Sequence, residues 1–484
     1  MVTPPLPLAV ILLPSSIVTL MTESQTHGDG RRSLESSADA AVRDPVELLQ
    51  DLIRFDTSNP PGNERTCLEF VAGVLEKGGV DSRLLSRDPE RPNLVARLAG
   101  GGQAPPLLLY GHVDVVPARA DEWLHPPFAG ELIEGEVWGR GALDMKGGVA
   151  MLISALLRIA ADDEPPPGDV ILTLTSDEER GSELGAKFLV EEHAEVFAGV
   201  RYAFSEIGGF TQWVGSRRLY PVQVAEKQHC LLRATIKGAG GHASVSRRAT
   251  AVSKLGAFLR VLDEERLPVH VTPNVTTMMG AMKAALPAHQ RVAARALLSP
   301  RLTDLVLRVL GEDAAPLASL LHNTATPTVV RGGESTNVVP TQVTVDLDGR
   351  VLPGQSPDDL IRELEVIAGN LAEFEVIHEE PAASAQPDLT LYPMLAEIIR
   401  RRDPGGVPIP ALIPGYTDAR CFSRLGIQTY GFLPMRLPKN ITVDLIHAAD
   451  ERVPAEAIRF GVDCLVEAIR RFPGELASGS PVIQ

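Results

Sequence analysis

A histidine and an aspartate follow a short apolar segment and could form part of a metal site. The segment Leu107–Tyr110 is fully apolar, which predicts a buried strand of a parallel sheet. His112 stands just past its end, at the sheet edge where α/β proteins bind ligands. Asp114 could accept the second imidazole proton and so fix the tautomer of His112. The alternative is an ordinary loop histidine beside a local aspartate, and this segment alone does not decide between the two.

Carboxylates stand at comparable positions in two further segments. Asp144 follows two glycines and precedes a predicted helix, where it could cap the helix or bridge two metal ions with its two oxygens. Three consecutive acids, residues 177–179, follow the predicted strand Val170–Thr175. Neighbouring carboxylates repel one another unless cations offset their charge. These acids are therefore either a solvated loop or a metal ligand beside a general base.

Two more candidates complete the set. Glu206 ends the predicted strand Tyr202–Ser205, and His447 precedes the last predicted helix. Two histidines and three carboxylates would give two zinc ions three protein ligands each, if Asp144 is shared, and would leave positions for water and substrate. Two metals about 3.5–4 Å apart, bridged by a carboxylate, form a recognised hydrolytic site. The predicted ligands are His112, Asp144, Glu179, Glu206 and His447.

Alternating strands and helices must position these residues. Apolar runs alternate with segments of helical periodicity from about residue 45, which predicts an α/β domain with a mostly parallel central sheet. After Pro221 the segments Leu231–Lys237 and Val343–Asp348 alternate apolar and polar residues, which is typical of sheets with one wet face. The later elements return to the α/β pattern, with a helix at Tyr392–Arg401, then a loop, then a strand at Gln428–Phe432. We therefore predict an N-terminal extension at 1–44, catalytic parts at 45–221 and 383–484, and an inserted α+β lid at 222–382.

Charge and cysteine content exclude several classes of protein. The 484-residue chain has a net charge of −16, and it lacks the basic footprint that nucleic-acid binding needs. Its four cysteines form no C-x-x-C pair, which fits a reducing cytoplasm and leaves any metal to histidine and carboxylate ligands.

Residues 1–20 are apolar but broken by prolines, and no lysine or arginine precedes the apolar run. A mis-assigned start is favoured there, export or lipid anchoring stays open, and we expect no membrane partner.

The chain resembles a family of dinuclear zinc hydrolases that includes aminoacylase, acetylornithine deacetylase, succinyl-diaminopimelate desuccinylase and glutamate carboxypeptidase. Beyond the five ligand segments, the resemblance rests on five motifs in the family's order and extends over about residues 45–472. The motifs are Trp123–Phe128, Gly238–Ser244, Thr336–Pro340, Asp348–Gly354 and Gly415–Arg420.

The resemblance implies a role for each matching residue. Asp144 would bridge the metals, His112 and Glu206 would complete one site, and Glu179 and His447 the other. Glu178 would be the general base, and Asp114 would orient His112. The inserted domain would be a ferredoxin-like lid and dimerisation domain, from which His242 reaches the substrate in the partner subunit of a homodimer. Asn337, Arg350 and Gly415 would bind substrate, with Asn337 and Arg350 holding its carboxylate, although Arg350 could instead form an ordinary surface salt bridge.

Three functions are compatible with these observations. The first is a carboxypeptidase or dipeptidase that cleaves a peptide bond next to a free carboxylate. The second is an N-acyl amino acid deacylase with the same chemistry. The third is a non-catalytic binding protein of the same fold, against which the complete ligand set argues. We expect two zinc ions per chain, replaceable by cobalt, and a peptide or N-acyl amino acid as substrate. The sequence gives no template for residues 281–327.

Overall fold

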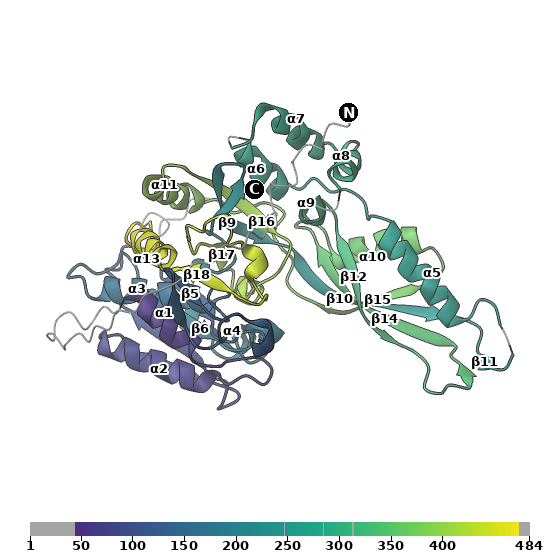
Figure 1. Cartoon of the computed structure of the whole chain (residues 1–484), viewed down its shortest axis with the longest axis horizontal. Coiled ribbons are helices and arrows are strands. Elements are labelled where there is room, and N and C mark those ends of the chain that lie inside the picture. Colours follow the sequence, from purple (N-terminus) through teal and green to yellow (C-terminus); the bar gives the residue numbers. More distant parts are fainter. Residues whose placement is uncertain (1–43, 246, 284, 312–313, 474–484) are drawn as a thin grey trace. The chain divides into compact units, whose positions relative to one another are not determined.

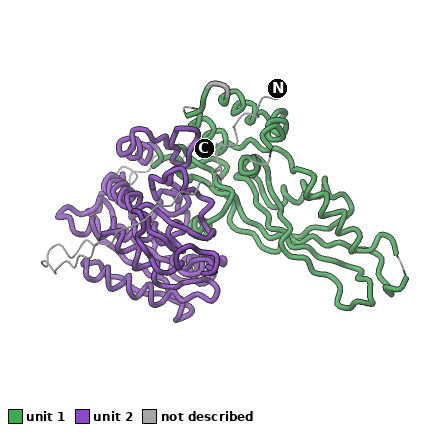
Figure 2. Tube along the Cα trace, in the orientation of Figure 1, with its two compact units in different colours: residues 1–9, 222–392, 409–424 green, residues 10–221, 393–408, 425–484 purple. Residues whose placement is uncertain are grey.

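The computed structural model describes residues 44–473 except 246, 284 and 312–313, and they form two compact units (Figure 1, Figure 2). Unit 1, green in Figure 2, contains residues 222–392 and 409–424. Unit 2, purple, contains the described residues up to 221, residues 393–408, and those from 425 onward. The apolar run at 1–20 and the rest of the predicted N-terminal extension lie outside the described residues, apart from Asp44.

The central strands of the large sheet are parallel, as the sequence predicts. The sheet has the order β1-β2-β6-β3-β7-β17-β9-β16, and β8 pairs with β9. The neighbours β6–β3, β3–β7 and β7–β17 run parallel, whereas β1 and β2 are antiparallel additions. Its strands are β1 (Ser82–Leu85), β2 (Asn93–Leu98), β3 (Leu107–His112), β6 (Val170–Thr175), β7 (Tyr202–Ser205), β8 (Gln212–Val214), β9 (Arg217–Glu226), β16 (Gly406–Ile413) and β17 (Gln428–Gly431).

Helix α3 (Lys146–Ala160) packs against the central strands, because its surface is apolar nearly all round. Helices α1 (Pro45–Ile53) and α13 (Ala455–Arg470) pack on α3, and α2 (Glu64–Lys77) packs on β1 and β2. A small sheet of β4 (Glu131–Ile133), β5 (Glu136–Trp138) and β18 (Arg452–Pro454) joins the segment before α3 to the segment before α13. The other helices outside the inserted α+β segment are α4 (Ala186–Glu192), α11 (Tyr392–Arg402) and α12 (Ala419–Ser423).

Unit 1 is built on an antiparallel sheet with the order β12-β14-β10-β15. In the chain the order is β10, α5, β12, β14, α10, β15, the β-α-β-β-α-β succession of a ferredoxin-like fold. Alternate residues of β10 and β14 form the core with α5 and α10. The bounds are β10 (Gln228–Lys237), α5 (Ala251–Glu264), β12 (Thr324–Arg331), β14 (Gln342–Val351), α10 (Pro357–Ala368) and β15 (Glu373–Glu379). The strands β11 (Gly241–His242) and β13 (Val338–Val339), which are far apart in the chain, pair in a separate two-stranded sheet.

Two predictions about local structure are wrong. The predicted loop between Arg401 and Gln428 contains β16, whose Pro408 and Pro410 disguise it because proline cannot donate to a sheet. Its place at the end of the strand order explains why the prolines are tolerated. The helical periodicity of Ser182–Glu195 predicts one helix over that range, but the structure has only α4 there, and the backbone φ of 66° at Ser182 prevents a helix from beginning at that residue.

The segment 281–327, for which we found no template, is largely helical. It contains α7 (Ala288–Leu297), α8 (Thr303–Leu310) and α9 (Ala315–Leu321), and α6 (Pro273–Met282) precedes it. These helices lie between α5 and β12, as an addition to the ferredoxin-like succession. Among the residues that the structure describes, no helix is both long enough and apolar enough to span a bilayer.

Candidate metal centre

The ends of three parallel strands bring most of the predicted ligands to one edge of the large sheet. His112 is the last residue of β3, Glu206 follows β7, and residues 178–180 form a 3-10 helix soon after β6. Because β6, β3 and β7 run parallel, their carboxyl ends meet at this edge. The positions that the sequence selected after apolar strands are therefore neighbours in space.

Two clusters share one aspartate. His112 Nε2 lies 3.2 Å from Asp144 Oδ1 and 3.4 Å from Glu206 Oε2. His447 Nε2 lies 3.2 Å from Asp144 Oδ2 and 3.3 Å from Glu179 Oε1. In each cluster the three candidate ligand atoms lie within 4.8 Å of one another. The two carboxylate oxygens of Asp144 thus face two different histidines, Oδ1 facing His112 and Oδ2 facing His447.

The helix-capping alternative for Asp144 does not fit this geometry. The N-cap of α3 is Met145, and the helix has no side-chain capping hydrogen bond. Burial opposes ionisation of Asp144, but hydrogen bonds from His112 and His447 outweigh it and hold the pKa of the carboxyl well below its ordinary value. Asp144 therefore stays ionised and is held between the two histidines.

The acidic run at 177–179 is not a solvated loop. The side chains of Glu178 and Glu179 are only 11% and 7% exposed. Glu178 Oε2 lies 4.0 Å from His112 Nε2 and belongs to neither three-residue cluster, whereas Glu179 belongs to one of them. Asp177 accepts from Asn59 and pairs with Arg91. The three adjacent acids thus have three different surroundings.

Asp114 contacts His112 through both its backbone and its side chain. The nearest oxygen to His112 Nδ1 is the backbone carbonyl of Asp114, at 2.9 Å, and a carboxylate oxygen lies 3.5 Å away. The buried carboxylate also accepts from the backbone N–H groups of Glu178 and Glu179, at 3.1 and 3.2 Å, and from Asn59 Nδ2 at 2.9 Å. Asp114 therefore connects the histidine segment to the acidic segment. Asn59 is not among the residues that the sequence predicts, since nothing in its neighbourhood marks it.

The donor set fits divalent metal ions. The buried Oε1 of Glu179 has His447 Nε2 as a neighbour at 3.3 Å but makes no well-formed hydrogen bond among the described residues, so it can still accept a cation. A hydrogen bond with Asp144 raises the pKa of His447 to about 10, and Glu179 adds to the effect. Burial opposes protonation of His112, yet the charge of Glu206 raises its pKa well above the ordinary value. The carboxylates thus hold an excess of negative charge that divalent ions would offset.

The other predicted site residues lie in unit 1. His242 is exposed and pairs in register with Val338, next to Asn337, and its Nδ1 lies 2.7 Å from Ser244 Oγ. The carbonyl of Asn337 accepts from the N–H of Ala243 at 2.9 Å. Of the predicted lid residues, His242 and Asn337 are thus brought together.

Arg350 lies beside the segment of Gly415. Its guanidinium stands 4.3 Å from the ring centroid of Tyr416, and Arg420 stands at the same distance from that ring. Arg350 donates to Asp348 through Nε at 2.5 Å and Nη2 at 2.9 Å, while its buried Nη1 has no hydrogen-bond partner among the described residues. Arg350 forms a salt bridge, as the alternative to a substrate-binding role predicts. Its buried Nη1, however, still has a hydrogen-bond donor to offer.

Two neighbours of Arg350 carry no predicted role. The His229 ring lies 5.1 Å from the ring of Tyr416, and its Nε2 lies 3.8 Å from Asp348 Oδ2. Burial and the charge of Arg350 lower the pKa of His229. His229 lies in β10, opposite Arg350 in the register, and the alternating pattern of this strand indicates sheet structure without revealing the contact with Tyr416.

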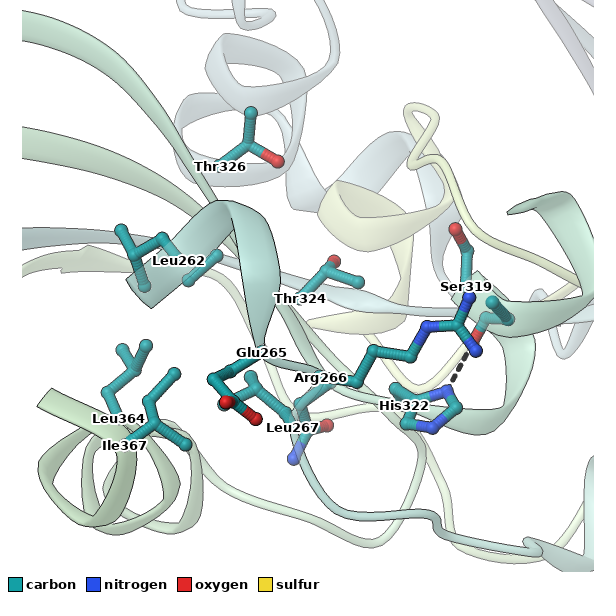
Figure 3. A pocket seen from close by; sticks show the side chains of 13 residues that line it. Leu262, Glu265, Arg266, Leu267, Ser319, His322, Thr324, Thr326, Leu364 and Ile367 are labelled. Atoms are coloured by element: carbon teal, nitrogen blue, oxygen red, sulfur yellow. Dashed lines mark hydrogen bonds between the residues drawn. The ribbon is translucent and has the colours of Figure 1, made fainter. Parts of the chain in front are cut away.

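The cavity in Figure 3 belongs to unit 1 and is distinct in composition from the clusters. It has a volume of about 220 Å³ and is lined by leucines and polar residues from α5, α9, β12 and α10. The ring of His322 at its wall is already engaged by the carbonyl of Ala318 at 2.8 Å. None of the clustered acids or histidines lines it, so the chemistry is not located there.

Known proteins resemble the chain in sequence and in structure. Residues 108–471 match Peptidase family M20/M25/M40. The N-fatty-acyl-amino acid synthase/hydrolase PM20D1 of Xenopus tropicalis is 28% identical over 377 residues, which is 75% of this chain and 72% of that protein. The succinyl-diaminopimelate desuccinylase of Cereibacter sphaeroides is 28% identical over 421 residues, covering 86% of this chain and 95% of the relative.

A solved structure shares the fold. The M20 family metallo-carboxypeptidase Sso-CP2 from Sulfolobus solfataricus superposes with a TM-score of 0.63 at 16% sequence identity, covering 89% of this chain and 99% of that one. The family match extends from within β3 to the end of α13 and so includes both clusters. The chain therefore belongs to Peptidase family M20/M25/M40 and is a hydrolase of peptide or amide bonds.

Proposed function

We propose that the chain is a dinuclear zinc peptidase that cleaves a peptide or amide bond next to a free carboxylate, in the manner of a carboxypeptidase or dipeptidase. The observation that carries this proposal is the pair of three-residue clusters that share Asp144. Each cluster offers one histidine and two carboxylates, a donor set that suits zinc and leaves a position for water or substrate. Cobalt can replace zinc in such a set.

The two ions would be held by His112, Asp144 and Glu206, and by Asp144, Glu179 and His447. When bound, they would supply Lewis-acid polarisation of the substrate carbonyl and lower the pKa of water towards about 7. The half-exposed side chain of His447, 50% accessible, supports access of a substrate to the otherwise buried clusters.

Glu178 would move the proton in the reaction. Its carboxylate stands close to the clusters without belonging to either, and from there it would accept a proton from the attacking water. It would then deliver that proton to the leaving nitrogen. The carboxylate of Asp114 would keep Glu178 in place by accepting a hydrogen bond, 3.1 Å long, from the backbone N–H of Glu178. His242 of the partner subunit would stabilise the oxyanion.

Arg350, Asn337 and Gly415 would recognise the substrate. The buried Nη1 of Arg350, which lacks a hydrogen-bond partner among the described residues, is a donor suited to a carboxylate. Tyr416 fixes the guanidinium plane from one face. The backbone of Gly415 is exposed, and a Cβ there would meet no atom within 4 Å, so this segment offers open space beside Arg350.

The second candidate is an N-acyl amino acid deacylase. The names of the two curated relatives favour it, since both describe enzymes whose substrates carry an acyl group on an amino acid nitrogen. The bond and the neighbouring carboxylate are of the same kind in both candidates. Only the group on the far side of the scissile bond differs.

A panel of substrates tests the proposal and separates the candidates. Dipeptides and N-acyl amino acids with free carboxylates are supplied to the zinc-loaded protein, and amine release is measured. We expect hydrolysis of the free acids, with higher kcat/KM for dipeptides, and a loss of about tenfold or more for the matching amides or methyl esters, because each lost charge-assisted hydrogen bond is worth about 1.5–3 kcal/mol. Higher kcat/KM for the N-acyl amino acids would favour the deacylase. Equal turnover of the acids and their esters would contradict recognition of the carboxylate.

Unit 1 supports a proposal about assembly. We propose that residues 222–382 are the lid and dimerisation domain of a homodimer, inserted between catalytic parts at 45–221 and 383–484. The ferredoxin-like strand order and the exposure of His242 support this division. We further propose that the protein acts in the cytoplasm without a membrane partner, which its four free, buried cysteines support.

A further inference from the structure

The two segments that hold Asp144 and His447 are joined by a short ladder. Strand β18 pairs antiparallel with β5, with Val453 opposite Val137 and Arg452 opposite Trp138. The ladder continues in a backbone hydrogen bond of 3.0 Å from the N–H of Gly139 to the carbonyl of Glu451. The loop after β5 leads to Asp144, and the loop before β18 contains His447, so the ladder sets the two loops side by side.

Glu451 fills the space between the loops. Its side chain is fully buried, with a relative exposure of 0%. The carboxylate accepts from the backbone N–H groups of Gly141 at 2.9 Å, Leu143 at 2.7 Å and Asp144 at 3.0 Å, and from Arg140 Nη1 at 2.7 Å. The single carboxylate of Glu451 thus stabilises the turn from Arg140 to Asp144 by four hydrogen bonds.

Arg140 links Glu451 to the backbone of His447. Its side chain is 3% exposed, and its Nη2 donates to the carbonyl of His447 at 3.2 Å. The guanidinium stands 5.2 Å from the ring of Trp123. His447 has a φ of 64°, a backbone conformation that a side-chain-bearing residue keeps only when its neighbours hold it. The hydrogen bond from Arg140 to the His447 carbonyl helps to stabilise this backbone conformation.

We propose that the buried ion pair Arg140–Glu451 is a positioning pair for the metal centre. It places the carboxylate of Asp144 and the ring of His447 at the separation that the cluster of Asp144, Glu179 and His447 requires, and it fixes the turn that carries Asp144 for both clusters. Neither residue belongs to the two ligand clusters, so both act through the groups they hold. The inference rests on the proposed metal centre and assigns that centre two residues outside its ligand set.

Substitution of Glu451 by Gln tests the pair. The variant keeps the size of the side chain but turns one acceptor into an amide donor that faces backbone N–H groups. Because Asp144 belongs to both clusters, the Kd values of both zinc ions should rise, by about 10–100-fold, the usual cost of losing a group that supports a ligand. Competition with a chelating dye measures both Kd values, and the visible spectrum of the cobalt-loaded protein reports a change in ligand geometry.

Asp403 provides a matched control in the same unit. It is also a buried carboxylate with an arginine partner, accepting from Arg218 Nε at 2.8 Å and from the hydroxyl of Tyr220 at 2.7 Å. Neither partner is a ligand in the two clusters. Asp403→Asn should lower the melting temperature of the metal-free protein and leave both metal Kd values unchanged.

Arg140→Lys is a second variant in case Glu451→Gln does not fold. Lysine keeps the positive charge but lacks the planar fork that reaches both Glu451 and the His447 carbonyl, so metal binding should weaken here too. The inference is overturned if both variants bind two metals with wild-type Kd, or if Asp403→Asn weakens metal binding as much as they do. A wild-type protein that binds no metal would contradict the proposed function itself, which separates the two failures.

Discussion

Glu178→Gln is expected to lower kcat by about 10²-fold or more, the smaller end of what general acid–base catalysis contributes, while the protein keeps its metal. Glutamine preserves the size and most of the hydrogen bonding of the side chain but cannot accept the proton of water. Because Glu178 stands outside both ligand clusters, its replacement should leave the number of bound ions unchanged. Steady-state kinetics and elemental analysis of the same preparation measure the two quantities.

Glu179→Gln should produce the opposite pattern. Glu179 belongs to the cluster with Asp144 and His447, so its loss should lower the metal content first and activity as a consequence. Glu183→Gln is the control, because this acid follows in the same loop, is exposed, and forms a salt bridge with Lys187 away from both clusters. If Glu178→Gln loses metal and Glu179→Gln keeps it, the roles of the two acids are reversed.

His242→Ala and Glu178→Gln should restore activity to each other when mixed. Each variant alone is expected to be nearly inactive, because every active site lacks one of the two groups. After random exchange of subunits, about half of the dimers are mixed, and in each mixed dimer one site has both an intact Glu178 and an intact partner His242. Activity should therefore rise to about a quarter of the wild-type value by this pairing arithmetic.

A mixture of Glu178→Gln and Glu179→Gln is the matched control for complementation. Both substitutions lie in the same segment of unit 2, so every site in a mixed dimer still lacks one group and activity should not rise. If subunit exchange is demonstrated and the mixture with His242→Ala also stays inactive, His242 does not act across a subunit interface.

The sequence could predict that Glu179, Glu206 and His112 lie near one another because of a simple property of parallel sheets. Apolar runs identified β3, β6 and β7, and residues that follow parallel strands meet at one edge. The same patterns were sufficient for α3 and α13, whose apolar positions recur with helical spacing. Local sequence thus determined the elements, and the direction of the strands determined which ends came together.

Other features depend on pairings that local sequence does not record. The pairing of β5 with β18 joins segments far apart in the chain, so the position of Asp144 opposite His447 and the function of Glu451 between them had no local signal. The prolines of β16 suggested a loop because they hide an edge strand. The contact of His229 with Tyr416 likewise arises only when two distant segments fold against each other.

The central claim is that the two clusters hold two divalent ions that catalysis requires. Its most direct test is a titration of chelator-treated protein with zinc, in which bound metal per chain and turnover of a dipeptide are measured on the same samples. We predict no turnover without metal, full turnover at two ions per chain, and recovery with cobalt as well. Full activity in protein shown to be free of metal would contradict the account.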